Sequence, residues 1–384
     1  MMLRVAVIGA GGREDALRWV LGRTASVLSE EQADDADLVV IGPEGPLVAG
    51  EADRRRGSGQ LVFGPGADGA WLEGSKAWMK EVLAAAGVPT ARSAAFAPGE
   101  ADAAVAFLAT LHGLYVVKTD YLAAGKGVLV TGSLAEAASD VRAKLARGAV
   151  VIEEGLTGPE LSVLAVCNGK DFVLLPASRD HKRVGDGDTG PNTGGMGAFS
   201  PVTGGEALDM EEVVGSTLAE LVRRGIDYRG VLYAGLMLTP DGPKVLEYNV
   251  RFGDPEAQVV LPRCTSDLAE LLRAAAAGEP LPEPTFTTDA CVTVVLATEG
   301  YPGEVRQGDE IVGLDDAEAM DGVVVFRAGV QVDGQARALT AGGRVLDVTA
   351  FGRTVADARA RVYEAVGRIS YPGMHYRSDI GGTA

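Results

Sequence analysis

Near its amino end the sequence has an apolar run of strand length, Leu3–Ile8, that passes directly into the glycine turn Gly9–Gly12. A segment with helical spacing of apolar residues follows this turn. Two more continuous apolar runs, Leu38–Ile41 and Leu61–Phe63, each end on a Gly-Pro turn. Strands that are apolar throughout are buried on both faces, as in a parallel sheet covered by helices. The sequence therefore predicts a Rossmann-like layer over residues 1–70.

Charge and composition narrow the classes of partner. The 384 residues include 35 Lys and Arg against 53 Asp and Glu, a net charge of −18. A chain this acidic lacks the basic surface that would attract a nucleic acid or an anionic membrane. We therefore expect neither a nucleic acid nor a membrane as a partner. No apolar run approaches the roughly 18–20 residues that span a bilayer. The cysteines Cys167, Cys264 and Cys291 are odd in number and widely spaced, which indicates buried thiols and a cytoplasmic protein.

The turn Gly9–Glu14 lies where a strand meets a helix, and the free N–H groups there can bind an anion such as a phosphate. A purely structural turn is one alternative. A dinucleotide site is another, but its fingerprint requires glycine where this chain has Glu14. Glu30 does lie about where a ribose-binding acid would stand in such a site.

Lys118 ends an apolar strand and is followed by a glycine-bearing loop, residues 120–127. The loop resembles a P-loop only superficially, because Lys126 precedes Gly127 rather than Ser or Thr and a strand follows. A hairpin flap fits better. A lysine at the end of a buried strand needs a partner, and either a nucleotide phosphate or a neighbouring carboxylate could supply it.

Two later stretches have few apolar residues and many polar ones. Residues 151–160 place acids directly after a strand, where main chain and carboxylates could hold an adenine and a ribose; a solvated acidic turn is the alternative. Residues 184–198 are rich in glycine and are expected to form a loop without regular structure. Since long loops in compact proteins are usually functional, we expect its backbone to approach a ligand.

The segment Glu247–Glu256 is the strongest chemical cluster. Strand alternation places Glu247, Asn249 and Arg251 on one face. Two oxygen donors suit Mg²⁺, which completes its shell with phosphate and water, and the guanidinium suits a carboxylate or a phosphoryl group. The preceding strand, residues 231–238, has no carboxylate, so Glu247 is expected to carry most of the metal binding.

Taken together, these motifs resemble the phosphoribosylamine–glycine ligases of the ATP-grasp superfamily. The likeness extends from Val5 to about Ile380 and rests on eight stretches: Gly9–Leu17, Ile41–Val48, Leu72–Lys76, Leu122–Val128, Asp180–Gly197, Leu232–Met237, Glu247–Glu256 and Gly342–Val348. It implies an α/β and α+β multidomain fold. The expected parts are a Rossmann-like N-terminal domain (1–70), an ATP-grasp domain (71–280) with a lid at about 90–165, and a small, mostly β C-terminal domain (285–384).

The resemblance also implies the reaction. ATP would phosphorylate glycine to glycyl phosphate, and 5-phosphoribosylamine would displace the phosphate to give glycinamide ribonucleotide in purine biosynthesis. The expected cofactors are ATP and Mg²⁺ or Mn²⁺, and the expected assembly is a monomer or a weak homodimer. A related carboxylate–amine ligase with other substrates is an alternative, and a nicotinamide-dependent dehydrogenase is a third reading that leaves residues 118–256 without a purpose.

The roles implied by the resemblance fall into four groups. The residues expected to act in catalysis are Arg251, Lys118 and Asn192. The residues expected to bind ATP are Lys76, Lys118, Ala123, Gly125, Lys126, Gly127, Glu153, Glu154, Leu156 and Glu160. The residues expected to bind glycine or phosphoribosylamine are Gly11, Gly12, Arg13, Glu14, Pro43, Glu44, Asp186, Pro191, Asn192, Thr193, Gly194, Gly195, Arg251, Gly253 and Asp254. The residues expected to bind the metal are Glu247 and Asn249.

Overall fold

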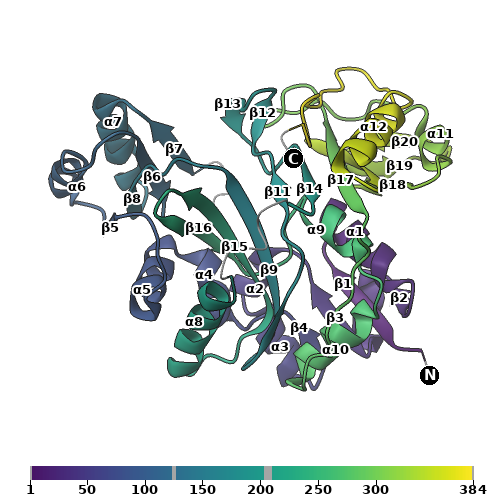
Figure 1. Cartoon of the computed structure of the whole chain (residues 1–384), viewed down its shortest axis with the longest axis horizontal. Helices are drawn as coiled ribbons and strands as arrows, with labels where there is room; N and C mark the ends of the chain where they lie inside the picture. Colours follow the sequence, from purple (N-terminus) through teal and green to yellow (C-terminus); the bar gives the residue numbers. More distant parts are fainter. Residues whose placement is uncertain (1, 123–126, 203–209, 383–384) are drawn as a thin grey trace.

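The structure is a computed structural model that describes residues 2–122, 127–202 and 210–382. Within these ranges it has four-stranded and five-stranded sheets with helices packed on them, arranged as the lobes seen in Figure 1. The expected mixed α/β architecture, with a small C-terminal part built mostly of strands, is confirmed. No helix in these ranges is long and apolar enough to cross a membrane.

The first layer is a parallel sheet in the order β2-β1-β3-β4, as the continuous apolar runs predict. Its strands are β1 (Arg4–Ile8), β2 (Ser26–Leu28), β3 (Leu38–Ile41) and β4 (Val62–Phe63). Its helices are α1 (Gly12–Leu21), the 3₁₀ turn η1 (Glu30–Asp35), α2 (Glu44–Val48), α3 (Glu51–Gly57) and α4 (Ala67–Gly74). Strand β2 was not predicted, because Ser26 is polar and exposed and the two half-buried residues after it are too few to give an apolar run.

The part of the chain predicted to form a lid is a separate lobe with its own hydrophobic core, at the left of Figure 1. Its sheet has the order β5-β8-β6-β7. The strands are β5 (Ser93–Phe96), β6 (Tyr115–Thr119), β7 (Val128–Thr131) and β8 (Val150–Glu154), with α6 (Ala101–Leu108) and α7 (Leu134–Leu145) beside them. Strands β6 and β7 pair antiparallel. Of the flap predicted for residues 120–127, positions 123–126 lie outside the described residues.

The central sheet carries the segment with the strongest chemistry. It has the order β10-β9-β15-β16 and consists of β9 (Glu160–Asn168), β10 (Phe172–Leu174), β15 (Arg229–Thr239) and β16 (Gly242–Asn249). Strands β15 and β16 form an antiparallel hairpin that turns between Thr239 and Gly242. The helices of this part are α5 (Lys76–Ala86), α8 (Met210–Arg223), α9 (Ala257–Val260), the 3₁₀ turn η3 (Leu261–Arg263) and α10 (Leu268–Ala277).

The last sheet draws strands from two distant stretches of chain. Its order is β11-β14-β17-β21-β18, with β11 (Arg179–Asp180), β14 (Gly197–Ser200), β17 (Ala290–Ala297), β18 (Val323–Arg327) and β21 (Arg344–Gly352). The same part contains a separate two-stranded sheet, β19 (Val330–Val332) and β20 (Ala338–Thr340), and the helices α11 (Leu314–Glu318) and α12 (Val355–Val366). Strands β11 and β14 thus belong to the same sheet as the strands of the C-terminal part. The proposed boundaries at 70, 280 and 285 stay predictions.

The glycine-rich stretch 184–198 is not the irregular loop that we expected. Strands β12 (Arg183–Gly185) and β13 (Thr189–Asn192) pair as a hairpin, and β14 begins at Gly197. Positive backbone φ angles at Gly187, Asp188 and Gly190 close the turn, so the glycines here also serve a hairpin. The expectation was wrong because a hairpin of glycine and polar residues lacks hydrophobic alternation.

Candidate active site

The proposed metal ligands lie at the end of β16. A β-bulge where β15 pairs with β16 shifts the register directly before Glu247. The Glu247 side chain is 40% exposed, whereas Asn249 is buried. The positive charge of Lys182 lowers the pKa of Glu247 to about 2, with further contributions from Lys118 and Lys76. Glu247 is therefore a carboxylate, open on one side and surrounded by cations.

Lys182 is a site residue that the sequence reasoning did not assign. Its Nζ lies 3.2 Å from the Glu160 carboxylate and 3.5 Å from the Glu247 carboxylate. It thereby brings Glu160, expected near ATP, to the proposed metal ligand Glu247. The charged run Asp180–Arg183 was the available signal, but only the fold shows which of its side chains reaches Glu247.

Arg251 is held between two carboxylates. Its guanidinium lies 3.3 Å from Glu44 on α2 and 3.0 Å from Glu73 on α4. It also donates to Asn249 Oδ1 at 3.1 Å, so it orients the amide of the second proposed metal ligand. Burial raises the pKa of Glu73, which accepts a further hydrogen bond from the Val250 amide. Glu73 stands inside the quoted motif Leu72–Lys76, but it was not assigned a role.

The two lysines proposed to hold phosphate reach the site from different elements. Lys118, on β6, lies 2.9 Å from a Glu153 oxygen and donates to Leu246 O, the residue before Glu247. Lys76, at the start of α5, donates to Tyr121 O at 3.1 Å, and burial lowers its pKa. The charges of both lysines lower the pKa of Glu247, which places both ammonium groups near the end of β16.

The remaining residues proposed for ATP are spread along the lid edge. Glu153 is 1% exposed, and both of its oxygens face lysines. Glu154 accepts from the Arg92 amide at 2.9 Å, and Leu156 is half-buried beyond it. Gly127 accepts a backbone hydrogen bond from Thr119. Three further residues predicted to bind ATP, Ala123, Gly125 and Lys126, lie outside the described residues.

The turn at the start of α1 joins this cluster through Arg13. The Arg13 guanidinium is buried, pairs with Glu14 at 2.6 Å and donates to Phe252 O at 3.3 Å. Gly12 packs so closely that a Cβ there would lie 1.6 Å from a carboxylate oxygen of Asp347. Pro43 and Glu44 begin α2 beside the turn, and a Cβ on Gly9 would meet the Pro43 ring at 2.7 Å.

An alternative for that turn was a nicotinamide cofactor with Glu30 as its ribose acid. The Glu30 carboxylate instead accepts a hydrogen bond from the Gly9 amide at 3.0 Å. The carboxylate thus occupies an N–H group of the turn and links it to η1.

The hairpin β12–β13 and the bend after it are fixed from the C-terminal part. Thr193 bonds back to Lys182 O, and Gly195, with φ of +116°, packs against Pro255. The Asp186 carboxylate accepts from the Ser378 amide at 2.8 Å. Of the other predicted residues, Pro191 is exposed and Asn192 is half-buried.

Arg344 is a further residue that was not assigned. It donates to Gly194 O at 2.8 Å and to Asp254 O at 3.0 Å, and its guanidinium lies 2.7 Å from the Asp254 carboxylate. Gln258 donates to the other oxygen of Asp254 and also to Asp347. Arg344 therefore ties two predicted substrate segments, Gly194–Gly195 and Gly253–Asp254, to strand β21.

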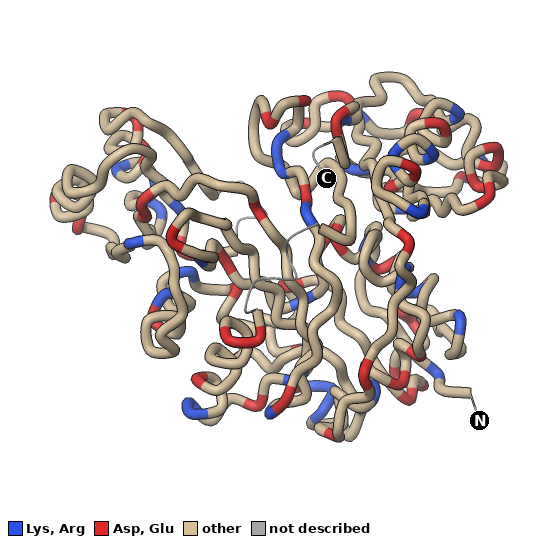
Figure 2. Tube along the Cα trace, in the orientation of Figure 1, with Lys and Arg blue, Asp and Glu red and all other residues tan. Residues whose placement is uncertain are grey.

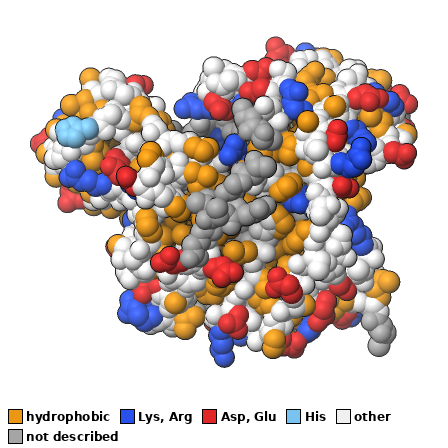
Figure 3. Space-filling model, in the orientation of Figure 1, with side chains coloured by type: hydrophobic (Ala, Val, Ile, Leu, Met, Phe, Trp, Pro, Cys, Tyr) orange, Lys and Arg blue, Asp and Glu red, His pale blue; other side chains and the backbone are white. Residues whose placement is uncertain are grey.

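Two features of the molecule concern where a ligand could bind: the shape of its surface and the distribution of its charges. Figure 3 shows an indentation between the lid lobe and the C-terminal lobe. Figure 2 shows acidic and basic residues interspersed along the trace, with no long basic stretch.

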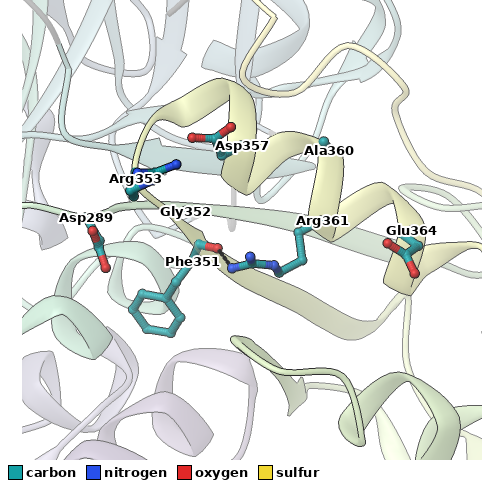
Figure 4. A pocket seen from close by; sticks show the side chains of 8 residues that line it. All are labelled: Asp289, Phe351, Gly352, Arg353, Asp357, Ala360, Arg361 and Glu364. Carbon is teal, nitrogen blue, oxygen red and sulfur yellow. Dashed lines mark hydrogen bonds between the residues drawn. The ribbon is translucent and has the colours of Figure 1, made fainter.

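A separate cavity of about 580 Å³ lies on the C-terminal part, between β21 and α12, lined by residues that include Arg353, Asp357 and Arg361 (Figure 4). None of the predicted site residues lines it.

Comparison with known proteins gives two family matches. Residues 74–257 match the model described as "Phosphoribosylglycinamide synthetase, ATP-grasp (A) domain", and residues 291–383 match the corresponding C domain.

Several curated and solved proteins are similar to the chain. A phosphoribosylamine–glycine ligase of Streptomyces coelicolor is 50% identical, over 91% of this chain and 84% of the relative. One from Synechocystis is 44% identical over 99% of both chains. The crystal structure of the Thermotoga maritima ligase matches with a TM-score of 0.86 at 33% identity, covering 98% of this chain and 100% of that one. A biotin carboxylase from Campylobacter jejuni, 12% identical with a TM-score of 0.70 over 98% of this chain and 93% of that one, shares the fold.

Proposed function

The chain belongs to the phosphoribosylamine–glycine ligase family, and we propose that the residues around Glu247 and Arg251 are the site where it joins glycine to 5-phosphoribosylamine. A carboxylate oxygen of glycine attacks the γ-phosphorus of ATP, and ADP leaves. The amine nitrogen of phosphoribosylamine attacks the resulting acyl carbon, and phosphate leaves. The products are glycinamide ribonucleotide, ADP and phosphate, in purine biosynthesis.

One observation carries the proposal: three lysines and an arginine surround the Glu247 carboxylate. The charges of Lys182, Lys118, Lys76 and Arg251 all lower the pKa of Glu247. Phosphoryl transfer depends on positioning and charge neutralisation more than on a protein nucleophile. Such a cluster of cations beside an open carboxylate fits a triphosphate that arrives with its divalent ion.

The donors at the end of β16 fit a hard divalent cation. Glu247 supplies an ionised carboxylate and Asn249 an amide oxygen, which are ligands that Mg²⁺ and Mn²⁺ accept. The described residues contain no group of three or more acidic, His or Cys ligands. That scarcity suits Mg²⁺, whose remaining positions are filled by phosphate oxygens and water. When bound, the ion would neutralise charge on the β- and γ-phosphates.

Glycine and its phosphoryl group belong, in this proposal, beside Arg251 and the backbone of Gly253 and Asp254. The five N–H groups of Arg251 allow a bidentate contact with a carboxylate, and the guanidinium already makes one contact each to Glu44 and Glu73. A substrate carboxylate would replace one of these contacts.

Phosphoribosylamine belongs between the α1 turn and the β12–β13 hairpin. The turn contributes Gly11–Glu14, with Pro43 and Glu44 beside it, and the hairpin contributes Asp186 and residues Pro191–Gly195. Support comes from Arg13, which bonds to Phe252 O directly before Gly253, so the turn adjoins the proposed glycine site. Asn192 is proposed to act on the reacting groups from the hairpin.

Adenosine is proposed to lie along the lid edge formed by Glu154, Leu156 and Glu160. Glu153, which the resemblance also implied for ATP, is not included in the proposed adenosine site, because both its oxygens already face ammonium groups. Gly127 belongs to the flap that would cover the phosphates.

The test is ADP release with each substrate omitted in turn, combined with mass spectrometry of the product. We expect ADP release to require both glycine and phosphoribosylamine, with glycinamide ribonucleotide formed in equal amount. Release supported by another carboxylate or amine, with no glycinamide ribonucleotide, would favour a related ligase with different substrates.

We further propose a cytoplasmic monomer or weak homodimer that binds neither nucleic acid nor membrane. The three cysteines are buried free thiols, which supports a reducing compartment. Sedimentation velocity would settle the assembly state.

A further inference from the structure

Two lysines face a single buried glutamate behind the phosphate site. Lys80 on α5 and Lys118 on β6 each place Nζ 2.9 Å from a different carboxylate oxygen of Glu153 on β8. Lys80, Lys118 and Glu153 are 9%, 7% and 1% exposed. Two cations with one anion leave a net charge of +1 in a buried place, where an unbalanced charge is costly.

The two lysines differ in what else they contact. Lys118 donates to Leu246 O, next to Glu247, so it is at the proposed phosphate site. Lys80 donates to Thr90 Oγ1 at 2.7 Å, and that hydroxyl donates to Val245 O at 2.6 Å. The Lys80 ammonium is thus fixed between Glu153 and Thr90, whereas Lys118 can exchange a partner for phosphate.

We propose that Lys80 is a positioning residue for ATP binding: it neutralises Glu153, so that Lys118 keeps its charge available for the phosphates of ATP. This inference rests on the proposed role of Lys118 in the ligase reaction. Without Lys80, Lys118 and Glu153 would form a closed pair of zero net charge. An incoming phosphate would then compete with a carboxylate for the same ammonium group.

The charges around Lys80 are consistent with this role. Burial lowers the pKa of Lys80 to about 8, with Lys118 acting in the same direction and Glu153 and Glu154 opposing. Burial also acts to raise the pKa of Glu153, but Lys118 and Lys80 outweigh it and hold that pKa below its ordinary value. Glu153 therefore stays ionised and needs a cation at each oxygen.

The test begins with Lys80→Met, which keeps the volume and removes the charge. We expect the Kd for MgATP, measured by calorimetry, and the KM for ATP to rise about 10- to 100-fold, the range of one charge-assisted hydrogen bond. The KM for glycine should stay within about twofold. Lys144→Met is the matched control, because Lys144 is a half-buried lysine that donates to Val117 O on β6 and pairs with Asp140 rather than Glu153.

The decisive variant is Lys80→Met combined with Glu153→Gln. Removing the carboxylate frees Lys118, so MgATP affinity should return to within about threefold of wild type. A merely structural role for Lys80 predicts no such rescue. Unchanged affinity in Lys80→Met, or a double variant no tighter than the single one, would overturn the proposal.

Folding and function are separated by the choice of assay. Thermal unfolding checks each variant, and Lys80→Gln, which keeps hydrogen bonds without the charge, replaces Lys80→Met if that variant does not fold. Calorimetry with MgATP needs neither glycine nor phosphoribosylamine. The result therefore stands even if the ligation assay fails and the proposed function has to be revised.

Discussion

Arg344→Met tests whether the C-terminal part holds the substrate segments in place. The guanidinium makes three contacts, to Gly194 O, Asp254 O and the Asp254 carboxylate, at 2.7 to 3.0 Å. All three involve a charged donor, and two of them end on one residue. Methionine keeps most of the side-chain volume and removes every contact.

The magnitude follows from burial. Removing one partner of a buried ion pair costs about 3–5 kcal/mol, and a single hydrogen bond to a charged group contributes about 1.5–3 kcal/mol. The side chains of Arg344 and Asp254 are 20% and 17% exposed, so water recovers part of the loss. Gln258 also remains bonded to Asp254. We therefore expect about 2–3 kcal/mol, which is about 30- to 150-fold in rate if it falls on substrate positioning.

The assay is steady-state ADP release with glycine and phosphoribosylamine varied separately at saturating ATP. The expected result is a fall in kcat/KM of that size for both substrates, with the KM for ATP within about twofold. Arg337→Met is the control, because its pair with Asp333 is nearly half exposed on the arginine side and such pairs contribute at most about 1 kcal/mol. A kcat/KM within threefold of wild type, or an equal loss of ATP affinity, would show that Arg344 does not position the substrate segments.

Three further predictions concern the site. Glu247→Ala should reduce turnover to less than about a tenth, a barrier increase above about 1.4 kcal/mol, while ATP still binds weakly; rapid-quench assays would measure both. Arg251→Lys should impair glycine use much more than ATP binding, because an ammonium cannot form the bidentate contact, and an unchanged KM and kcat for glycine would remove Arg251 from the site. Burial raises the pKa of Asp347 to about 7 from an ordinary value of 3.8, so its stabilising contribution is full below pH 4 and is lost as the pH rises through 7. Urea unfolding should therefore show Asp347→Asn gaining stability over wild type between pH 4 and pH 8, by up to about 4 kcal/mol, and parallel pH profiles would contradict this.

Local sequence was enough for elements that bury apolar residues continuously or end on a clear signal. Helix α5 spans Lys76–Ala86 with Gly87 in the left-handed conformation at its end, as the Gly-Val-Pro sequence predicts. Strand β3 likewise has the predicted bounds. The hairpin β12–β13 was missed because its residues pack little apolar surface.

The residues of the candidate site that sequence analysis missed were missed for a different reason, because their partners are distant in the sequence. Arg344 reaches Asp254 across 90 positions of sequence, and Lys80 reaches Glu153 across 73. No spacing rule connects such pairs, since the fold alone brings them together. Glu73 was hidden inside a recognised motif, because its role appears only when Arg251 lies beside it. The functional side chains of a single strand could be predicted from the sequence, whereas contacts between separate lobes could not.

The central claim is that the glycine carboxylate is phosphorylated before the amine attacks. The most direct measurement uses glycine labelled with ¹⁸O in its carboxylate, with phosphoribosylamine and MgATP, and mass spectrometry of the inorganic phosphate. We expect one ¹⁸O atom in the phosphate for each glycinamide ribonucleotide formed, because the carboxylate oxygen that attacks the γ-phosphorus leaves with it. Phosphate without ¹⁸O, at an equal yield of product, would contradict phosphorylation of the glycine carboxylate.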